Sequence, residues 1–394
     1  MKFRLMMLAL VIPALVCCQP KNPEDPEDPN NQETPVDPGT DPGTNPAPED
    51  EEELAPEVKN GDTILACDPT VEQFLTDVHY PENDYTYTKI SDYPTSPGKC
   101  DKPQSYTIRW TKDESAGELT AKLWESDWSR EYTLDAGEYY LTITNLRPNA
   151  EYNYYVKTSS GKVMTEGKFK TTGHVHQVFF KSRVRNARDL GGWKTKDGKT
   201  VKYRKVYRGG RLESGTMTKA GLKDVLAEGI RAQLDLRGKS DVLSKCALGE
   251  GYDFCAPVIE EGYTQMLSKD QEKTRQCFEF IVKCVRENKP VYYHCSLGRD
   301  RTGTVSMILL GLLGVPEGDV SQEYELTQFA PHGWATSDGE KTKMTRRVDY
   351  KSAATYIWGY AGEGGSFADG VEAYLLSIGV SQQDIDDFRS LMLE

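Results

Sequence analysis

Between residues 58 and 173 the apolar positions of this 394-residue chain form short alternating runs. Three of these runs cover residues 106–110, 139–143 and 152–156, and Pro, Gly and Asn turns separate them. Alternation with a period of two is typical of strands that bury one face. Regular short strands of this kind predict an all-β sandwich domain over residues 58–173.

After residue 174 the apolar pattern changes, and strand-like runs alternate with helical ones. We expect strands at residues 230–236 and 291–294, and helices at residues 274–287 and 302–313. This alternation predicts an α/β domain over residues 174–394 with a mostly parallel central sheet. Ligands of such sheets bind at the carboxyl ends of the strands, where the next helix begins.

The first 18 residues have the pattern of an export signal. Lys2 and Arg4 precede an apolar run at residues 5–16, which is too short to span a bilayer as a mature helix. The run ends in Cys17 and Cys18, and a cysteine at that point resembles the lipidation site of bacterial lipoproteins. Cys18 is the favoured acceptor, with Leu15 three residues before it, although the choice between the two cysteines stays open. The resemblance implies an exported lipoprotein of the bacterial cell envelope, held at a membrane by its lipid.

Most of the net charge of −13 lies in one segment. Residues 19–57 contain thirteen Asp or Glu and a single lysine, Lys21, and are otherwise rich in Pro, Asn and Thr. Such a composition has almost nothing to bury and predicts a disordered tether. Because no basic stripe accompanies the acidic total, we do not expect a nucleic-acid partner.

Nine cysteines in an exported protein suggest disulfides. Once Cys17 and Cys18 are set aside the number is odd, so at least one thiol stays free, and Cys295 is the expected one. We hypothesise a bridge between Cys67 and Cys100, because both lie in the same N-terminal segment.

The strongest chemical signal is the run from His294 to Gly303, at the turn between an expected strand and an expected helix. It places Cys295 six residues before Arg301, which Thr302 and Gly303 follow. A loop that wraps over a helix N-terminus directs several backbone N–H groups and the helix dipole at one point, where an anion and a thiolate are both stabilised. The spacing of Gly298 and Gly303 also fits a nucleotide-binding loop, but the lysine that this loop requires is missing.

Each residue of this loop has an expected role. We expect Cys295 to be a nucleophile, Arg301 to bind phosphate oxygens in a planar fork, and Thr302 to donate a hydrogen bond to the sulfur. The loop residues expected to surround the bound phosphate are Ser296, Leu297, Gly298, Arg299 and Gly303, and His294, which precedes the nucleophile, is expected to belong to the catalytic set. A buried structural cysteine and a phosphate-binding module without turnover are the alternatives.

Residues from about 176 to 394 resemble the protein tyrosine phosphatase superfamily, and within it the bacterial branch of tyrosine and phosphoinositide phosphatases. Beyond the loop, the resemblance rests on residues 186–192, 206–212, 234–237, 313–315 and 377–380. It implies the cysteine-phosphatase fold and hydrolysis of phosphomonoesters through a phosphocysteine intermediate, without metal or cofactor. The expected substrate is a protein phosphotyrosine, with phosphoinositides or inositol polyphosphates as the alternative.

The resemblance also implies a general acid. No Trp-Pro-Asp motif precedes Cys295, and in this branch an Asp inside the loop is implicated, a position that Asp300 occupies here. Asp253 and Glu260 are the other candidate acids, and a helix N-cap is the structural alternative for Asp300. Arg299 places a cation beside the expected phosphate site, which resembles enzymes that accept multiply phosphorylated substrates. A role as a solvated loop residue fits equally well.

Two further features have a functional and a structural interpretation. Arg188 and Asp189 are expected to position the substrate or the loop, or to act as structural braces. Residues 146–156 and 167–172 resemble the late strands of a fibronectin type III domain, which speaks to the fold of the N-terminal part and not to chemistry.

Overall fold

The structure, a computed structural model, describes residues 54–83, 90, 93, 100–182, 184–212, 217–330 and 347–394. The expected signal peptide, the Cys18 lipidation site and nearly all of the tether therefore lie outside the described residues. In the described part, residues Leu54–Glu394 form one compact unit. Its mixture of strands and helices confirms the expected α/β character.

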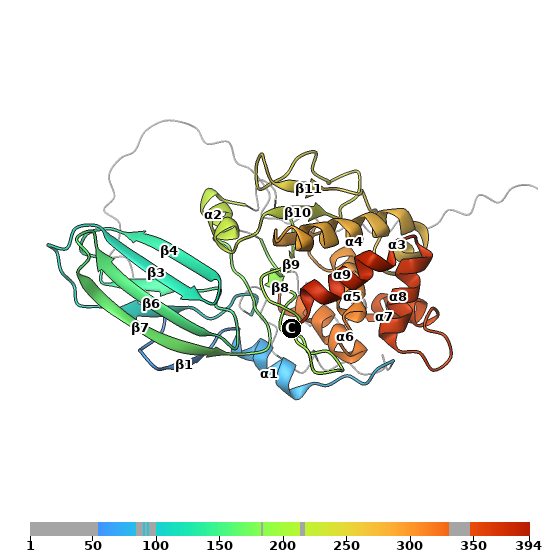
Figure 1. Ribbon diagram of the computed structural model, residues 1–394, viewed down its shortest axis with the longest axis horizontal. Helices are drawn as coiled ribbons and strands as arrows, with labels where there is room; N and C mark the ends of the chain where they lie inside the picture. The colour runs from blue at the N-terminus through green and yellow to red at the C-terminus, as the bar shows by residue number, and fades with distance from the viewer. Residues whose placement is uncertain are drawn as a thin grey trace, which may run out of the picture. The chain divides into compact units, whose positions relative to one another are not determined.

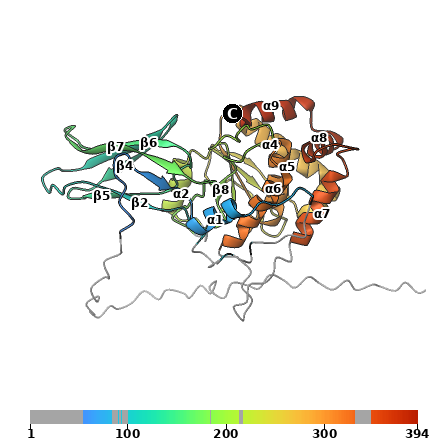
Figure 2. The same ribbon diagram turned by 90° about the horizontal axis from the view of Figure 1, so that it is seen from below.

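The N-terminal part contains two sheets. One has the strand order β1 (Thr63–Leu65), β7 (Val163–Thr172), β6 (Glu151–Thr158), β3 (Leu119–Glu125), β4 (Trp128–Leu134) (Figure 1). The other pairs β2 (Tyr106–Arg109) with β5 (Tyr140–Ile143), which are labelled in Figure 2. Every second residue of β3 is buried, as its alternating apolar pattern requires. Side chains from both sheets, including Ile108, Leu123, Tyr152 and Phe169, share one hydrophobic cluster.

A helix interrupts this strand-rich segment, so the expectation of an all-β segment is wrong there. Helix α1 (Pro69–Asp77) begins where the Asp68 carboxylate accepts hydrogen bonds from the Thr70 and Val71 backbone N–H groups. Its Phe74 packs against Phe329, far along the chain, with ring centroids 5.6 Å apart. Figure 2 shows α1 next to α6 (Glu317–Glu325), the helix that precedes Phe329.

The second five-stranded sheet has the order β11 (Asp253–Cys255), β10 (Ala232–Asp235), β12 (Val291–His294), β9 (Val206–Gly209), β8 (Arg188–Asp189). Strands β11, β10, β12 and β9 run parallel, and β8 pairs with β9 in the antiparallel direction. The expected strand 291–294 and helix 274–287 appear as β12 and α4 (Gln271–Arg286). Strand β12 lies between β10 and β9, so its carboxyl end opens at the middle of the sheet.

Helices pack around one buried helix, α5 (Asp300–Leu312), which follows β12. Every residue of α5 from Thr302 to Leu312 is buried. Its neighbours are α3 (Tyr263–Lys269), α4, α6, α7 (Arg347–Trp358) and α8 (Phe367–Ser377), while α9 (Gln382–Met392) packs on α4 and α2 (Lys219–Ala227) lies nearer the N-terminal sheets (Figure 1). Among the described residues, no helix combines the length and apolar character needed to cross a bilayer.

The expected bridge between Cys67 and Cys100 is absent, and the seven cysteines in the described part of the chain are free thiols. Both residues are buried in the same hydrophobic cluster around α1. The Cys67 thiol instead donates a hydrogen bond to the Glu72 carboxylate, 3.2 Å away. Burial together with the negative charge of Glu72 raises the pKa of this thiol, which keeps it protonated and slow to oxidise.

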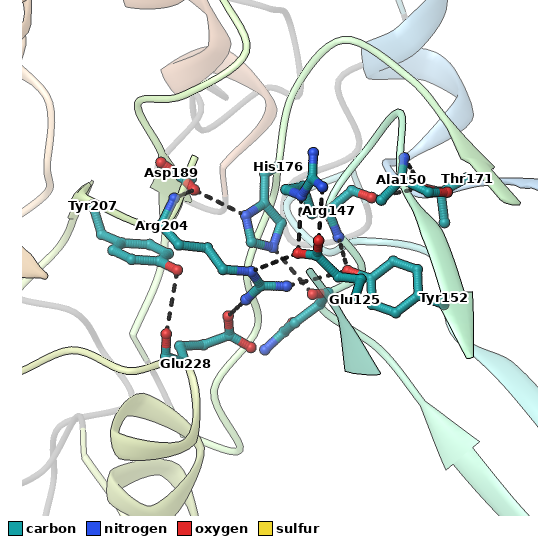
Figure 3. A network of polar contacts seen from close by, with 11 residues as sticks. Glu125, Arg147, Ala150, Tyr152, Thr171, His176, Asp189, Arg204, Tyr207 and Glu228 are labelled. Atoms are coloured by element: carbon teal, nitrogen blue, oxygen red, sulfur yellow. Dashed lines mark hydrogen bonds and ion pairs between the residues drawn. The ribbon is translucent and has the colours of Figure 1, made fainter. Parts of the chain in front are cut away.

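A buried polar network joins the N-terminal sheets to the second sheet, and Arg204 is at its centre (Figure 3). Its guanidinium bonds to Glu125 at 3.3 Å, to Glu228 at 2.7 Å and to the Tyr152 hydroxyl at 3.1 Å. The same group lies 4.0 Å from the ring centroid of Trp128. Burying a cation is costly unless it is paired, and here two carboxylates from different parts of the chain pair with it.

We predict that Arg204→Ala lowers the free energy of unfolding by roughly 3–5 kcal/mol, because it leaves the carboxylate of Glu228 buried without its ion pair. Denaturant titration of the full chain measures this loss. The neighbouring Lys205→Ala, which removes only an exposed hydrogen bond to Asn288, should stay within about 0.5 kcal/mol of the native protein. Equal effects of the two substitutions would contradict the central role of Arg204.

Candidate active site

The run that contains Cys295 forms the turn between β12 and α5. Strand β12 ends at His294 and α5 begins at Asp300, so the intervening loop lies over the amino end of a 13-residue helix. Helix dipole and free N–H groups at this end favour negative charge. The sulfur of Cys295 therefore lies where a phosphate would be held, and the residue is only 3% exposed.

Gly298 allows the loop to fold back on the sheet. Its φ is +70°, and a Cβ at this position would overlap the backbone of Gly209 at the end of β9. Two side chains then fix its carbonyl: Asn186 donates to it at 2.8 Å, and Arg208 donates a second, short hydrogen bond. Asn186 also donates to the Leu297 carbonyl at 3.2 Å. These contacts direct the loop carbonyls toward the protein interior.

Arg208 and Arg188 share one carboxylate beneath the loop. The Arg208 guanidinium, which is fully buried, bonds to Glu323 at 2.9 Å and to the Ser306 hydroxyl at 2.9 Å. Arg188 bonds to Glu323 at 2.8 Å and to the Asn186 side chain. Burial and the nearby charge of Arg208 lower the pKa of Arg188 to about 10, which still leaves it protonated at neutral pH. Two cations against one carboxylate leave a positive excess next to the loop.

The contacts of Arg188 and Asp189 fit the bracing interpretation. Arg188 is linked to the loop through Asn186 and Glu323, and it has no hydrogen bond to Cys295 or Arg301 among the described contacts. Asp189 contacts His176 at 3.1 Å and accepts a hydrogen bond from the Arg204 backbone at 2.6 Å, and His176 in turn contacts the Asn145 carbonyl of the N-terminal part at 3.1 Å. Both residues thus hold the framework of the site.

His294 is buried and neutral. The Gln233 amide donates to its Nε2 at 2.8 Å, so Nδ1 carries the proton and donates to the Cys295 carbonyl at 3.1 Å. The orientation of the Gln233 amide is fixed because its oxygen accepts a hydrogen bond from the Ala247 backbone. Burial lowers the pKa of His294 to about 4, although Asp235 opposes the shift. This residue therefore positions the cysteine and does not carry charge.

The Cys295 thiol has a lowered pKa although it is buried. Burial alone raises the pKa of this thiol, but the Arg301 cation and the hydrogen bonds from the Thr302 hydroxyl and backbone outweigh it. The Thr302 hydroxyl is itself buried without a hydrogen-bond partner among the described residues, which leaves its proton available to the neighbouring Cys295 sulfur. The thiolate is the nucleophilic form of cysteine, and a lowered pKa increases its share.

Two further segments border the loop. The Arg301 guanidinium donates to the Ile259 carbonyl at 2.9 Å, and Gly262 comes so close to the start of α5 that a Cβ there would lie 3.0 Å from the Arg301 nitrogen. On another side, Ser296 donates its hydroxyl proton to Asp241 at 2.6 Å. The segments that follow β10 and β11 therefore complete the rim of the site.

Asp300 is the first residue of α5 and is not its N-cap. The N-cap position is occupied by Arg299, which makes no side-chain capping bond. The Asp300 carboxylate instead accepts hydrogen bonds from the Tyr263 hydroxyl at 2.5 Å and from the Arg299 guanidinium at 2.8 Å. The Tyr263 hydroxyl also contacts that of Tyr324. These contacts fix the carboxylate next to the loop, and they hold Arg299, only 5% exposed, against Asp300.

The two other candidate acids differ in position. Asp253 lies at the amino end of β11, opposite Ala232, whereas His294 pairs with Asp235 at the carboxyl end of β10. The Asp253 carboxylate is also paired with Lys289 at 2.5 Å and with Lys283 at 3.0 Å, and these hydrogen bonds lower the pKa of Asp253. Asp253 is therefore at the wrong end of the sheet. Glu260 is exposed on the rim segment, where it accepts a hydrogen bond from the Lys239 backbone at 3.0 Å.

Several residues of the site had no role in the sequence interpretation. Asn186 and Arg208 lie in two of the segments that carried the resemblance, so a signal was present without an assigned function. Tyr263, Gln233 and Asp241 gave no local signal, because only the fold brings them to the loop. Across the residues that the structure describes, no three His, Cys, Asp or Glu side chains gather as a metal site would require.

Comparisons with known proteins point to one family. The sequence pattern described as "Tyrosine phosphatase family" matches residues 181–394. A tyrosine-protein phosphatase of Nostoc commune is 29% identical over 142 residues, which are 33% of this chain and 48% of that protein. A candidate tyrosine-protein phosphatase of Cupriavidus necator is 25% identical over 172 residues, covering 38% of this chain and 62% of that protein. The chain thus spans about half to three fifths of the length of these two relatives.

A comparison with solved structures found a mutant form of Tk-PTP, whose sequence is 20% identical to this chain and whose TM-score is 0.25. The match covers 34% of this chain and 84% of the Tk-PTP chain.

We predict that iodoacetamide alkylates Cys295 at pH values below the ordinary thiol range, because the lowered pKa maintains the thiolate there. In Arg301→Ala the lost cation should raise the pKa and move the rate profile to higher pH. Peptide mass spectrometry of alkylation rate against pH measures both profiles. The half-buried Cys246, whose pKa burial raises, is an internal control and should react only at higher pH. Coincident profiles for the two cysteines would contradict the assignment.

Proposed function

Because this chain belongs to the tyrosine phosphatase family, we propose that it hydrolyses phosphomonoesters through a phosphocysteine intermediate, with protein phosphotyrosine as the main substrate class. The observation that carries the proposal is the Cys295 thiol, whose pKa is lowered by Arg301 and Thr302 at the amino end of α5. A nucleophile and an anion site in one loop fit phosphoryl transfer, in which positioning and charge stabilisation do most of the catalysis.

The proposed reaction has two steps. In the first, the Cys295 sulfur attacks phosphorus, the bond to the leaving oxygen breaks, and that oxygen takes a proton from Asp300. Arg301 and the backbone N–H groups of the loop stabilise the charge on the other phosphate oxygens. In the second, Asp300 takes a proton from water while the water oxygen attacks phosphorus. The bond between phosphorus and sulfur then breaks, which releases phosphate and restores the thiolate with its hydrogen bond from Thr302.

The contacts of Asp300 support its role as the acid. It lies five residues after the nucleophile, and its carboxylate is oriented by Tyr263 and Arg299. Burial, the Tyr324 hydroxyl and the Asp300 charge raise the pKa of Tyr263, so the phenol stays a hydrogen-bond donor. Held within the loop, the Asp300 carboxyl serves as acid in its protonated form and then, once ionised, as base, as two-step phosphoryl transfer requires. Glu260 on the rim is the remaining alternative.

The pairing of Arg299 favours phosphotyrosine over inositol polyphosphates. A cation that reads a second phosphate group must be available to it, whereas Arg299 is buried and bonded to Asp300. A phosphoinositide or inositol polyphosphate substrate remains the alternative activity, and a phosphate reader without turnover is the alternative class. If Arg299→Ala lost rate only on inositol polyphosphates, the substrate assignment would change.

We also propose that the N-terminal part is a fibronectin type III-like sandwich over residues 58–173, and that the catalytic domain covers residues 174–394 with a mostly parallel sheet. The two packed sheets and their shared hydrophobic cluster support the first assignment. The proposed export as a lipoprotein of the bacterial cell envelope, with Cys18 lipidated, rests on residues 1–18 alone. Its partners would be a membrane and a phosphorylated protein, and no nucleic acid.

We predict that Cys295→Ser abolishes hydrolysis of aryl phosphates by the full chain in the presence of reductant and chelator. Asp300→Asn should slow hydrolysis of phenyl phosphate by roughly 10²- to 10⁴-fold, the usual contribution of a general acid. It should slow hydrolysis of p-nitrophenyl phosphate less, because that leaving group needs less help from a proton. Steady-state rates on the two substrates measure the difference.

The matched control for Asp300→Asn is Asp253→Asn, which removes a surface carboxylate paired with two lysines. Its rates on both substrates should stay close to those of the native protein. If Asp253→Asn lost activity on phenyl phosphate while Asp300→Asn kept it, the assignment of the acid would be wrong. If the native chain released no phosphate, the phosphate-reader alternative would replace the proposed activity.

A further inference from the structure

A pocket of about 320 Å³ opens in the N-terminal sheets at the end of the β3–β4 hairpin, on residues to which no role has been assigned above. Strands β3, β4 and β6 adjoin one another in Figure 1 and supply its walls. The volume is at the lower end of the roughly 300 to 1,000 Å³ typical of small-molecule sites. The lining residues are Lys122, Trp124, Ser126, Asp127, Trp128, Ser129 and Tyr155.

Two aromatic side chains, Trp124 and Tyr155, form the walls of this pocket, and Trp128 borders it. The rings of Trp124 and Tyr155 lie edge to face, with centroids 5.7 Å apart and planes inclined by 60°, and both side chains are half-buried. Trp128, which pairs with Glu125 and therefore lies on the other face of the hairpin, contacts the Arg204 guanidinium and makes an edge contact with Tyr152. Rings fixed in this way are preorganised, so a ligand can pack on them at little entropic cost.

The polar groups around the rings balance in charge. Lys122, which is paired with Glu131 at 3.4 Å, provides one cation, and Asp127 provides one anion, while Ser126 and Ser129 provide hydroxyl groups. A second cation, Lys157, lies 4.1 Å from the centroid of the Tyr155 ring. A charged ligand would meet a like charge here, whereas a neutral ligand rich in hydroxyl groups could bond to all of these side chains.

We propose that this pocket binds a neutral saccharide unit, with the apolar face of a sugar ring packed on Trp124 and Tyr155. Sugars combine an apolar C–H face with a rim of hydroxyl donors and acceptors, which is the combination that aromatic walls and mixed polar groups recognise. A phosphorylated peptide is disfavoured, because phosphate recognition relies on clustered arginines and the lining here contains none. The saccharide site lies outside the cysteine loop and does not depend on the proposed hydrolysis.

The test uses the full chain and measures binding without turnover. Isothermal titration and tryptophan fluorescence would be recorded with six neutral oligosaccharides: cello-, malto-, laminari-, xylo-, manno- and N-acetylchito-oligomers. We expect at least one to bind, and we expect Trp124→Ala to weaken that binding by about tenfold or more, the scale of one aromatic anchor. The control is Tyr139→Ala, which removes an exposed aromatic ring that does not line the pocket.

Several outcomes would overturn the saccharide proposal. They are failure of all six oligosaccharides to bind at millimolar concentration, equal binding by Trp124→Ala and the native chain, and loss of binding in Tyr139→Ala. Preference for an acidic or phosphorylated peptide over every sugar would also contradict it. An unchanged thermal unfolding temperature and unchanged aryl phosphate hydrolysis in Trp124→Ala separate loss of the pocket from loss of the fold. These controls also keep the outcome independent of the proposed catalytic chemistry.

Discussion

The site depends first on the buried guanidinium of Arg208. This group connects the end of β9 to the Gly298 carbonyl of the loop, to Ser306 in α5 and to Glu323 in α6. The Arg208 guanidinium donates a hydrogen bond to the Gly298 carbonyl oxygen, which therefore points away from the ligand. The loop can then turn its N–H groups toward the phosphate. Arg188 adds a second cation to the same carboxylate. The loop is therefore shaped by hydrogen bonds and lies over a local excess of positive charge, and both favour a thiolate and an anion.

Arg204 and Arg208 lie only four residues apart, and β9 joins them. Arg204 is inserted among Glu125, Tyr152 and Trp128 of the N-terminal sheets, whereas Arg208 braces the loop. The short strand β9 thus links two sets of contacts. Arg204 before it binds the N-terminal sheets, and Arg208 within it holds the cysteine loop in shape. The N-terminal part is bound to the rest by paired buried charges, and loss of one partner would leave a carboxylate without compensation in a dry environment.

Local patterns in the sequence predicted the elements that depend on local chemistry. The apolar run 291–294 and the glycine-containing turn after it indicated β12, the loop and α5, because strand, turn and helix signals follow one another there. The mixed α/β character and the tyrosine phosphatase resemblance were confirmed. Helix α1 was missed because its Asp68 cap and Pro69 lie in a short segment that resembles a turn. The partners Tyr263, Gln233 and Asp241 could not be predicted, since only tertiary packing brings them to the loop. The predicted disulfide between Cys67 and Cys100 was wrong, because nearness in sequence does not establish a bond.

The most direct test of the account is to trap the covalent intermediate. The full chain would be mixed with an aryl phosphate, quenched in acid during turnover, and digested for mass spectrometry of the peptide that contains Cys295. We expect phosphate bound to the Cys295 sulfur in the native chain and none in Cys295→Ser. Steady hydrolysis with no phosphate on Cys295, or with phosphate on another side chain, would contradict it.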